Sequence, residues 1–114
     1  MTDDIILDTD LEHFEQDVLE ASHRQPVLVD FWADWCAPCI VIAPILEQVV
    51  RDREGEVRLV KLEVDAGENM KLAGRYQVRG FPTVILFRDG EERGRFSGAQ
   101  RADFIERFID EHGA

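Results

Sequence analysis

Short apolar runs along this chain are separated by polar stretches, and this pattern is typical of buried strands joined by loops and helices. The run from Val27 to Trp32 is almost entirely apolar, as expected of a strand that is covered on both sides. Asp89-Gly90 is a hairpin turn signal with a strand candidate on each side. The pattern predicts five strands, at residues 5–7, 27–32, 57–64, 83–87 and 92–96.

The first helix is predicted directly after the first strand. Thr9 and Glu12 stand at the spacing of a capping box, in which a threonine hydroxyl and a glutamate carboxylate satisfy free N–H groups at a helix start. Leu11, Phe14 and Val18 would then share one face of the helix. We therefore expect this helix to begin at Thr9.

Three further helices follow from apolar residues at helical spacing. A long helix is expected from about Ala37 to Arg53, and Pro44 should kink it. A short helix is expected between Met70 and Tyr76, and an amphipathic helix closes the chain. The apolar positions that define them are Ile42, Ile45, Leu46 and Val49, then Met70, Ala73 and Tyr76, then Phe104, Ile105, Phe108 and Ile109.

The order of these elements predicts an α/β protein with a mixed sheet. A helix lies between the strands at 27–32 and 57–64, which implies a parallel pair, whereas the hairpin implies an antiparallel pair. With 114 residues and no linker, repeat or low-complexity segment, the chain is expected to form one domain over residues 1–114.

Composition restricts the partners and the location. The chain has 13 basic and 24 acidic residues, and its net charge of −11 disfavours binding to nucleic acid or to anionic membrane surfaces. No stretch approaches the roughly 18 to 20 apolar residues of a membrane span. The acidic start Met1-Thr2-Asp3-Asp4 carries no secretory signal pattern, so we expect a cytoplasmic protein.

The two cysteines of the chain, Cys36 and Cys39, follow the strand at 27–32 directly. At the start of a helix, residues three apart lie on one face with Cβ atoms roughly 5 to 6 Å apart, so the pair can form a disulfide and reopen without unfolding. Cys-x-x-Cys next to a strand and a helix is the pattern of a thiol–disulfide exchange site. We expect redox exchange at this pair.

Other functions of the cysteine pair fit less well. A structural zinc site needs four ligands, and His13, His23 and His112 are isolated from the cysteines, so no metal is expected. Haem attachment needs a histidine after the second cysteine, where Ile40 stands, and an iron–sulfur cluster needs more thiolates. A purely structural disulfide remains possible, although so short a loop gains little stability from it.

Further sequence blocks accompany the cysteine pair along the chain. In order, the blocks are Val29-Asp30-Phe31-Trp32-Ala33, Trp35-Cys36-Ala37-Pro38-Cys39, Ala43-Pro44-Ile45-Leu46, Lys61-Leu62-Glu63-Val64-Asp65, Gly80-Phe81-Pro82-Thr83 and Ser97-Gly98-Ala99. Together they resemble the thioredoxin family over nearly the whole chain. The resemblance implies a central mixed sheet flanked by helices on both faces, with the cysteines at a strand-to-helix turn.

The two cysteines should have different roles. A helix N-terminus stabilises a thiolate, and Cys36 occupies that end, so we expect Cys36 to attack client disulfides. Cys39 lies one turn deeper and should resolve the mixed disulfide. Asp30 lies in an apolar strand, where burial should raise the pKa of its carboxyl. The resemblance implies that Asp30 takes the proton of Cys39, the alternative being a polar residue that only finds a hydrogen bond.

Further site residues come from the resemblance. Lys61 resembles the family's lysine near the buried acid, although it could be an ordinary ion-pairing lysine. Trp32 and Trp35 would shape and shield the site, or serve only as packing. Pro82 would form a cis peptide bond facing the cysteines, and the backbone of Phe81 would pair with an extended client segment. The implied docking surface consists of Trp35, Ala37, Pro38, Phe81 and Gly98.

We therefore expect a monomeric protein-disulfide reductase that needs no bound cofactor, with a thioredoxin reductase and disulfide-containing clients as partners. Two alternatives stay open: a disulfide oxidase or isomerase on the same fold, and a binding module or holdase chaperone with regulatory cysteines. Ile40 departs from the family, which usually has lysine or arginine after the second cysteine. This departure adds apolar surface beside the site and concerns partner choice more than chemistry.

Overall fold

A five-stranded sheet forms the centre of the computed structural model, which describes residues 5–114. The strands are β1 (Ile6–Asp8), β2 (Val27–Trp32), β3 (Arg58–Glu63), β4 (Thr83–Arg88) and β5 (Glu91–Ser97). They are ordered β1-β3-β2-β4-β5; β1, β3 and β2 run parallel, and β4 and β5 pair antiparallel. The predicted mixed sheet is confirmed. The acidic start, from which we expected no secretory signal, lies at residues 1–4, outside the described residues.

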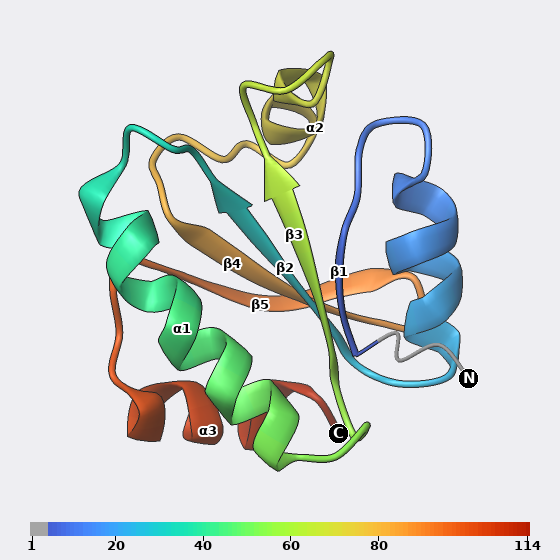
Figure 1. Cartoon of the computed structure of the whole chain (residues 1–114). Coiled ribbons are helices and arrows are strands. Elements are labelled where there is room, and N and C mark those ends of the chain that lie inside the picture. The colour runs from blue at the N-terminus through green and yellow to red at the C-terminus, as the bar shows by residue number, and fades with distance from the viewer. Residues whose placement is uncertain (1–4) are drawn as a thin grey trace.

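Helices cover both faces of this sheet, as predicted (Figure 1). On one face lie α1 (Ala37–Asp52) and α3 (Ala102–His112); on the other lie the helical segments η1 (Glu15–Glu20) and η2 (Ala21–His23) together with α2 (Met70–Arg75). Alternate residues of β2 divide between two apolar cores: Val27 and Val29 face η1, whereas Leu28 faces α1. No helix within residues 5–114 is long and apolar enough to span a membrane.

The start of the first helical segment differs from the prediction. The Thr9 N–H donates to the Lys61 carbonyl (3.0 Å), so Thr9 still belongs to the strand ladder, and its hydroxyl donates to Asp17 (2.7 Å). The Asp10 carboxylate instead accepts the His13 N–H (2.9 Å). The capping box at Thr9 and Glu12 was therefore wrong, because the sheet already uses the threonine. Phe14 and Val18 are buried as expected.

The hairpin between β4 and β5 is confirmed at Asp89-Gly90. Both residues have positive φ (55° and 80°), the conformation of the two-residue turn that matches the twist of a hairpin. Leu86 pairs with Gly94 and Phe87 pairs with Glu92, so Arg93 forms a bulge in β5. The helix α1 continues past Pro44 and ends one residue earlier than predicted. The kink at Pro44 stays a prediction.

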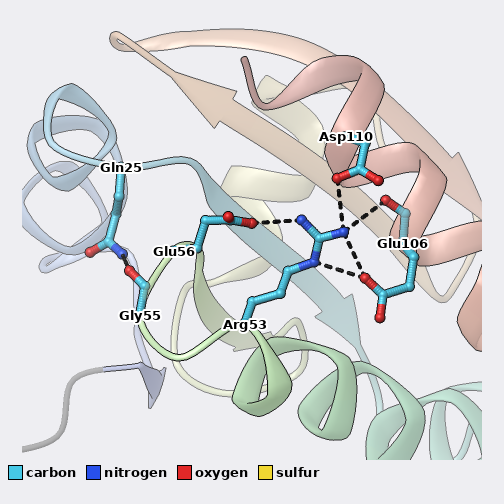
Figure 2. A network of polar contacts seen from close by, with 6 residues as sticks. All are labelled: Gln25, Arg53, Gly55, Glu56, Glu106 and Asp110. Carbon is cyan, nitrogen blue, oxygen red and sulfur yellow. Dashed lines mark hydrogen bonds and ion pairs between the residues drawn. The ribbon is translucent and has the colours of Figure 1, made fainter.

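A network of ionic contacts joins the end of α1 to α3. Arg53, the residue after the last turn of α1, donates to Glu56 (2.7 Å), Glu106 (2.8 Å) and Asp110 (2.9 Å). Figure 2 shows the guanidinium of Arg53 between these three carboxylates, with the separate hydrogen bond from Gln25 to the Gly55 carbonyl nearby. Because α1 and α3 pack on the same face of the sheet, this network fixes one helix against the other.

Candidate redox site

The two cysteines lie where β2 passes into α1, and they form a disulfide. Cys36 is the N-cap of α1: its backbone is extended (φ −97°, ψ 105°), and its Sγ accepts the Cys39 N–H at 3.3 Å. Their Cα atoms are 5.3 Å apart, within the usual range for a disulfide. The expected positions of both cysteines at the helix start are therefore confirmed.

The surroundings of the two sulfur atoms differ. Cys36 stands at the end of the helix, where backbone N–H groups have no helical partner and favour negative charge. Cys39 lies in the first turn and is almost completely buried. Pro38 occupies the first turn as well, where its missing N–H costs nothing because no helical acceptor exists there. Ala37 and Pro38 are exposed beside the buried pair.

Trp35 stands immediately before the disulfide, and 66% of it is exposed. Its indole Nε1 donates to Asp65 Oδ2 at 2.6 Å, which fixes the ring although solvent surrounds it. The ring of Phe81 meets it edge to face, with 6.0 Å between the ring centroids. An exposed aromatic side chain that is held in one orientation is suited to contacts with another molecule.

A second loop contributes to the same surface. The peptide bond between Phe81 and Pro82 is cis, as the resemblance implied. The Gly98 N–H donates to the Pro82 carbonyl (3.0 Å), so the loop after β5 is joined to the loop before β4. Gly98 has a positive φ of 83°, and a Cβ built on it would meet no atom within 4 Å. The structure thus brings Trp35, Phe81, Pro82 and Gly98 together from distant parts of the sequence.

Asp30 is buried in β2, with 1% of its surface exposed, and its Oδ1 has no hydrogen-bond partner. Burial raises the pKa of Asp30 from 3.8 to about 7, because the charged carboxylate loses its hydration; the positive charge of Lys61 opposes this shift and the negative charge of Glu47 adds to it. A carboxyl group with a pKa near neutrality can exchange protons at physiological pH.

Lys61 pairs with Asp30 in the strand register, yet its ammonium donates to another carboxylate. The Nζ lies 3.1 Å from Glu47 Oε2 on α1 and 5.6 Å from the centre of the Trp32 ring. Trp32 is half-buried, and its own Nε1 is buried without a hydrogen-bond partner. Lys61 therefore stands between two carboxyl groups and forms its ion pair with the one on the helix.

Two residues of the site escaped the sequence analysis: Glu47 and Asp65. Glu47 follows the buried Leu46 on α1, and 31% of its side chain is exposed, so a charge at the edge of the buried face was the available signal. Asp65 follows β3, and nothing in the sequence joins it to Trp35. Within residues 5–114, no group of three or more histidine, cysteine or acidic side chains is arranged to hold a metal ion.

The comparisons with known proteins agree with this site. Residues 5–111 match the sequence model of the family described as Thioredoxin. The chain is 44% identical over 110 residues to Thioredoxin of Pseudomonas aeruginosa, which covers 96% of this chain and 97% of that protein. It is 42% identical over 107 residues to Thioredoxin C-2 of Corynebacterium nephridii, which covers 94% of this chain and 95% of that protein.

These matches span the strands, the helices and the cysteine pair alike. Thioredoxins bind no cofactor, because the disulfide itself accepts and donates the electrons. The expected reductase function follows from the same matches at the level of the family. With its Cys36–Cys39 disulfide at the start of α1, the chain belongs to the thioredoxin family and is a thiol–disulfide oxidoreductase of the protein-disulfide reductase type.

Proposed function

We propose that Cys36 attacks the disulfides of client proteins and that Cys39 resolves the resulting mixed disulfide. The observation that carries this assignment is the position of Cys36 as N-cap of α1, with its sulfur accepting a backbone N–H at 3.3 Å. Hydrogen bonding of this kind and the helix dipole both favour a thiolate. Cys39 lies deeper in the first turn and keeps its proton until resolution.

The exchange balances in two steps. The Cys36 thiolate attacks one client sulfur; a Cys36–client disulfide forms, the client disulfide breaks, and the second client sulfur leaves as a thiolate that takes a proton from water. Cys39 then loses its proton and attacks Cys36, which forms the Cys36–Cys39 disulfide and releases the first client sulfur. The client gains two electrons and this protein loses two, which a separate reductase restores.

Asp30 is the group that accepts the proton of Cys39. A pKa of about 7 suits this role, because the carboxylate is present at neutral pH and is basic enough to take a proton from a thiol. Burial to 1% exposure and an unpartnered Oδ1 leave the carboxylate available for this transfer. Lys61 and Trp32 act on Asp30 by charge and by excluding water, not by contact with the client.

Clients dock on the surface formed by Trp35, Ala37, Pro38, Phe81, Pro82 and Gly98. The edge-to-face contact of Trp35 with Phe81 and the hydrogen bond from Gly98 to Pro82 hold its parts in one arrangement. An extended client segment would pair with the backbone of Phe81 in the manner of an added strand, and the absence of a side chain at Gly98 leaves room for it.

The partners are a thioredoxin reductase and proteins with accessible disulfides, and the protein acts as a monomer. Its net charge of −11 argues against nucleic acid and anionic membranes as partners. The protein acts in the cytoplasm, where cellular reductants keep thiols reduced and a dithiol reductase can be recharged. The relatives named thioredoxin favour this reductase over the alternatives, an oxidase or isomerase and a holdase chaperone. A reduction potential well above that of the glutathione pool would favour the oxidase or isomerase.

Two single variants test the division of roles. Cys39→Ser should accumulate mixed disulfides with client proteins that carry a disulfide, because the Cys36 thiolate still attacks and no second thiol resolves the product. Cys36→Ser should trap nothing and should lose reductase activity. In the reduced wild type, iodoacetamide should modify Cys36 much faster than Cys39 at pH 7, as read by mass spectrometry. Trapping by Cys36→Ser instead, or equal alkylation rates, would contradict the assignment.

A further inference from the structure

Three residues with carboxyl groups are neighbours of Lys61: two by strand pairing and one by an ion pair. In the sheet its Cα is paired with that of Asp30 on one side and with that of Asp8 on the other. Paired residues of neighbouring strands project to the same face, so both carboxyls are near Lys61. Helix α1 adds Glu47 from above this face. The Lys61 ammonium could form an ion pair with any of these three carboxylates. Which one it binds determines how close its positive charge lies to Asp30.

The ammonium lies with the helix. Its Nζ is 3.1 Å from Glu47 Oε2 and lies over the Trp32 ring, while Oδ1 of Asp30 has no partner. The other oxygen of Glu47 is 4.0 Å from Arg51, one turn further along α1, so the glutamate is held from two sides. Trp32 and Glu47 together give the lysine a fixed position that leaves the buried carboxyl unpaired.

We propose that Glu47 is a positioning residue that holds the Lys61 ammonium on α1 and so prevents an ion pair between Lys61 and Asp30. The functional significance of this inference rests on the proposed role of Asp30 as proton acceptor. The position of Lys61 can be tested without that role. A direct ion pair would stabilise the carboxylate and make it a poor acceptor for a thiol proton.

The charges near Asp30 agree with this arrangement. Burial is the main cause of its raised pKa, Lys61 opposes the shift and Glu47 adds to it. On β4 the residue paired with Asp30 is Val84, which carries no charge. Asp30 is thus governed by one cation and one anion, and these two form an ion pair with each other.

The test is Glu47→Gln, which keeps the size of the side chain and removes its charge. Titration of the Asp30 carboxyl by ¹³C NMR in the oxidised protein isolates this group, because the cysteines do not titrate in the disulfide. We expect the midpoint to fall by about one pH unit, since the freed ammonium turns to Asp30. An unchanged midpoint overturns the proposal.

Asp8→Asn is the matched control. Asp8 is paired with Lys61 in the sheet, and both residues line a surface cavity of about 430 Å³. Even so, no ion pair joins the two among residues 5–114. Its replacement should move the Asp30 midpoint by less than a third of the shift in Glu47→Gln. An equal shift would mean that any nearby negative charge has this effect, which overturns a specific role for Glu47.

A second pair of variants distinguishes the positioning of the Lys61 ammonium from the direct electrostatic effect of the Glu47 charge on Asp30. In a Lys61→Met background no ammonium can turn to Asp30, so adding Glu47→Gln should move the midpoint by less than half of its effect in the wild type. An equal effect in both backgrounds overturns positioning through Lys61. Because the side chains of Lys61 and Glu47 both reach the surface, both proteins are expected to fold, and unfolding curves verify this.

The role of Asp30 is tested separately, by the pH dependence of the step that releases a mixed disulfide. If the NMR midpoint shifts and the release profile shifts with it, both proposals are supported. If the midpoint shifts and the release profile does not, the positioning role of Glu47 stands and the role of Asp30 as acceptor is wrong. The two failures therefore give different results.

Discussion

Folding removes two ionisable side chains from water at the two ends of α1: Asp30, in the strand that leads into the helix, and Arg53, where the helix ends. The two differ in how many hydrogen-bond partners the folded protein gives them. Arg53 binds three carboxylates and the Glu106 carbonyl (Figure 2). Asp30 keeps an unpartnered oxygen, and its pKa is raised to about 7. The lysine beside it is bound elsewhere, on Glu47.

Because Arg53 is hydrogen-bonded and Asp30 is not, the two residues serve different purposes: Arg53 stabilises the fold, and Asp30 is available for proton transfer. A buried charge that is fully hydrogen-bonded stays charged and joins elements to one another. A buried carboxyl without partners costs stability when it ionises, and for that reason it releases and takes up protons near neutral pH. We therefore expect changes at Arg53 to affect the fold and changes at Asp30 to affect the chemistry.

The largest effect is expected for Asp30→Asn on the pH dependence of stability. The pKa of Asp30 is about 7 in the folded protein against 3.8 for a free side chain, so between these values the folded state binds its proton more tightly than the unfolded state. Wild-type stability should therefore fall as pH rises from about 4 to 7 and remain low above 7. Asparagine cannot ionise, and the variant should gain up to about 4 kcal/mol over the wild type at pH 8 relative to pH 3.

Guanidinium chloride unfolding of the oxidised proteins at pH 3, 5 and 8 measures this gain. Any cost of burying the asparagine amide is the same at each pH and cancels in the comparison. The exposed Asp8→Asn variant, which keeps Asp30, serves as control, and its difference in stability from the wild type should be the same at all three pH values. A gain that is equal at all three pH values would mean that Asp30 is not a proton-binding group in this range, and the comparison with Arg53 would fail.

The effect on the fold at the other end of α1 is expected to be smaller. Arg53→Met keeps the aliphatic part of the side chain and leaves Glu56, Glu106 and Asp110 without their shared partner. Because these carboxylates are partly exposed and rehydrate, we expect a loss of about 2 kcal/mol in the free energy of unfolding rather than the full cost of a buried unpaired charge. The rate of client reduction per folded molecule should not change.

Arg107→Met is the control for Arg53→Met. Arg107 forms an exposed ion pair with Asp103 on α3 at 3.6 Å, and its loss should change the free energy of unfolding by less than about 0.5 kcal/mol. Denaturant unfolding and an insulin-reduction assay are run on both variants. A tenfold slower reduction by folded Arg53→Met would show that the network also supports the chemistry, so that stability and reactivity are not separated along α1.

How much of this arrangement can be predicted from sequence differs between the two ends of α1. The apolar run of β2 and the Cys-x-x-Cys pattern predict the strand-to-helix turn, and the polar Asp30 inside an apolar strand already indicates a buried acid. The ion pair between Glu47 and Lys61 joins residues 14 positions apart, and the bonds from Arg53 to Glu106 and Asp110 join residues more than 50 positions apart. Such pairs depend on how α1 packs on the sheet and on α3, which local patterns do not contain.

The same limit explains the wrong start of the first helix. Thr9 and Glu12 have the local spacing of a capping box, but the Lys61 carbonyl on β3 takes the Thr9 N–H and extends the ladder by one residue. A tertiary contact outweighed a local preference. The cis bond before Pro82 was likewise expected from the family resemblance alone, because most X-Pro bonds in folded proteins are trans.

The smallest effect on the chemistry is expected for Ile40→Lys, which adds a cation near the N-terminal end of α1. Ile40 follows Cys39 and is 55% exposed, so a charge there is screened by water. It would stabilise the Cys36 thiolate by a few tenths of a kcal/mol to about 1 kcal/mol. The rate of reduction of the disulfide by dithiothreitol should therefore stay nearly unchanged. The rate with a thioredoxin reductase should change more, because a charge beside the docking surface alters which partner surfaces fit and how fast they associate.

Val41→Lys, at a neighbouring position with 56% exposure, is the matched control and should change the reductase rate less. Equal changes with dithiothreitol and with the reductase would mean that residue 40 tunes the thiol, so that even the exposed part of this end of α1 belongs to the chemistry.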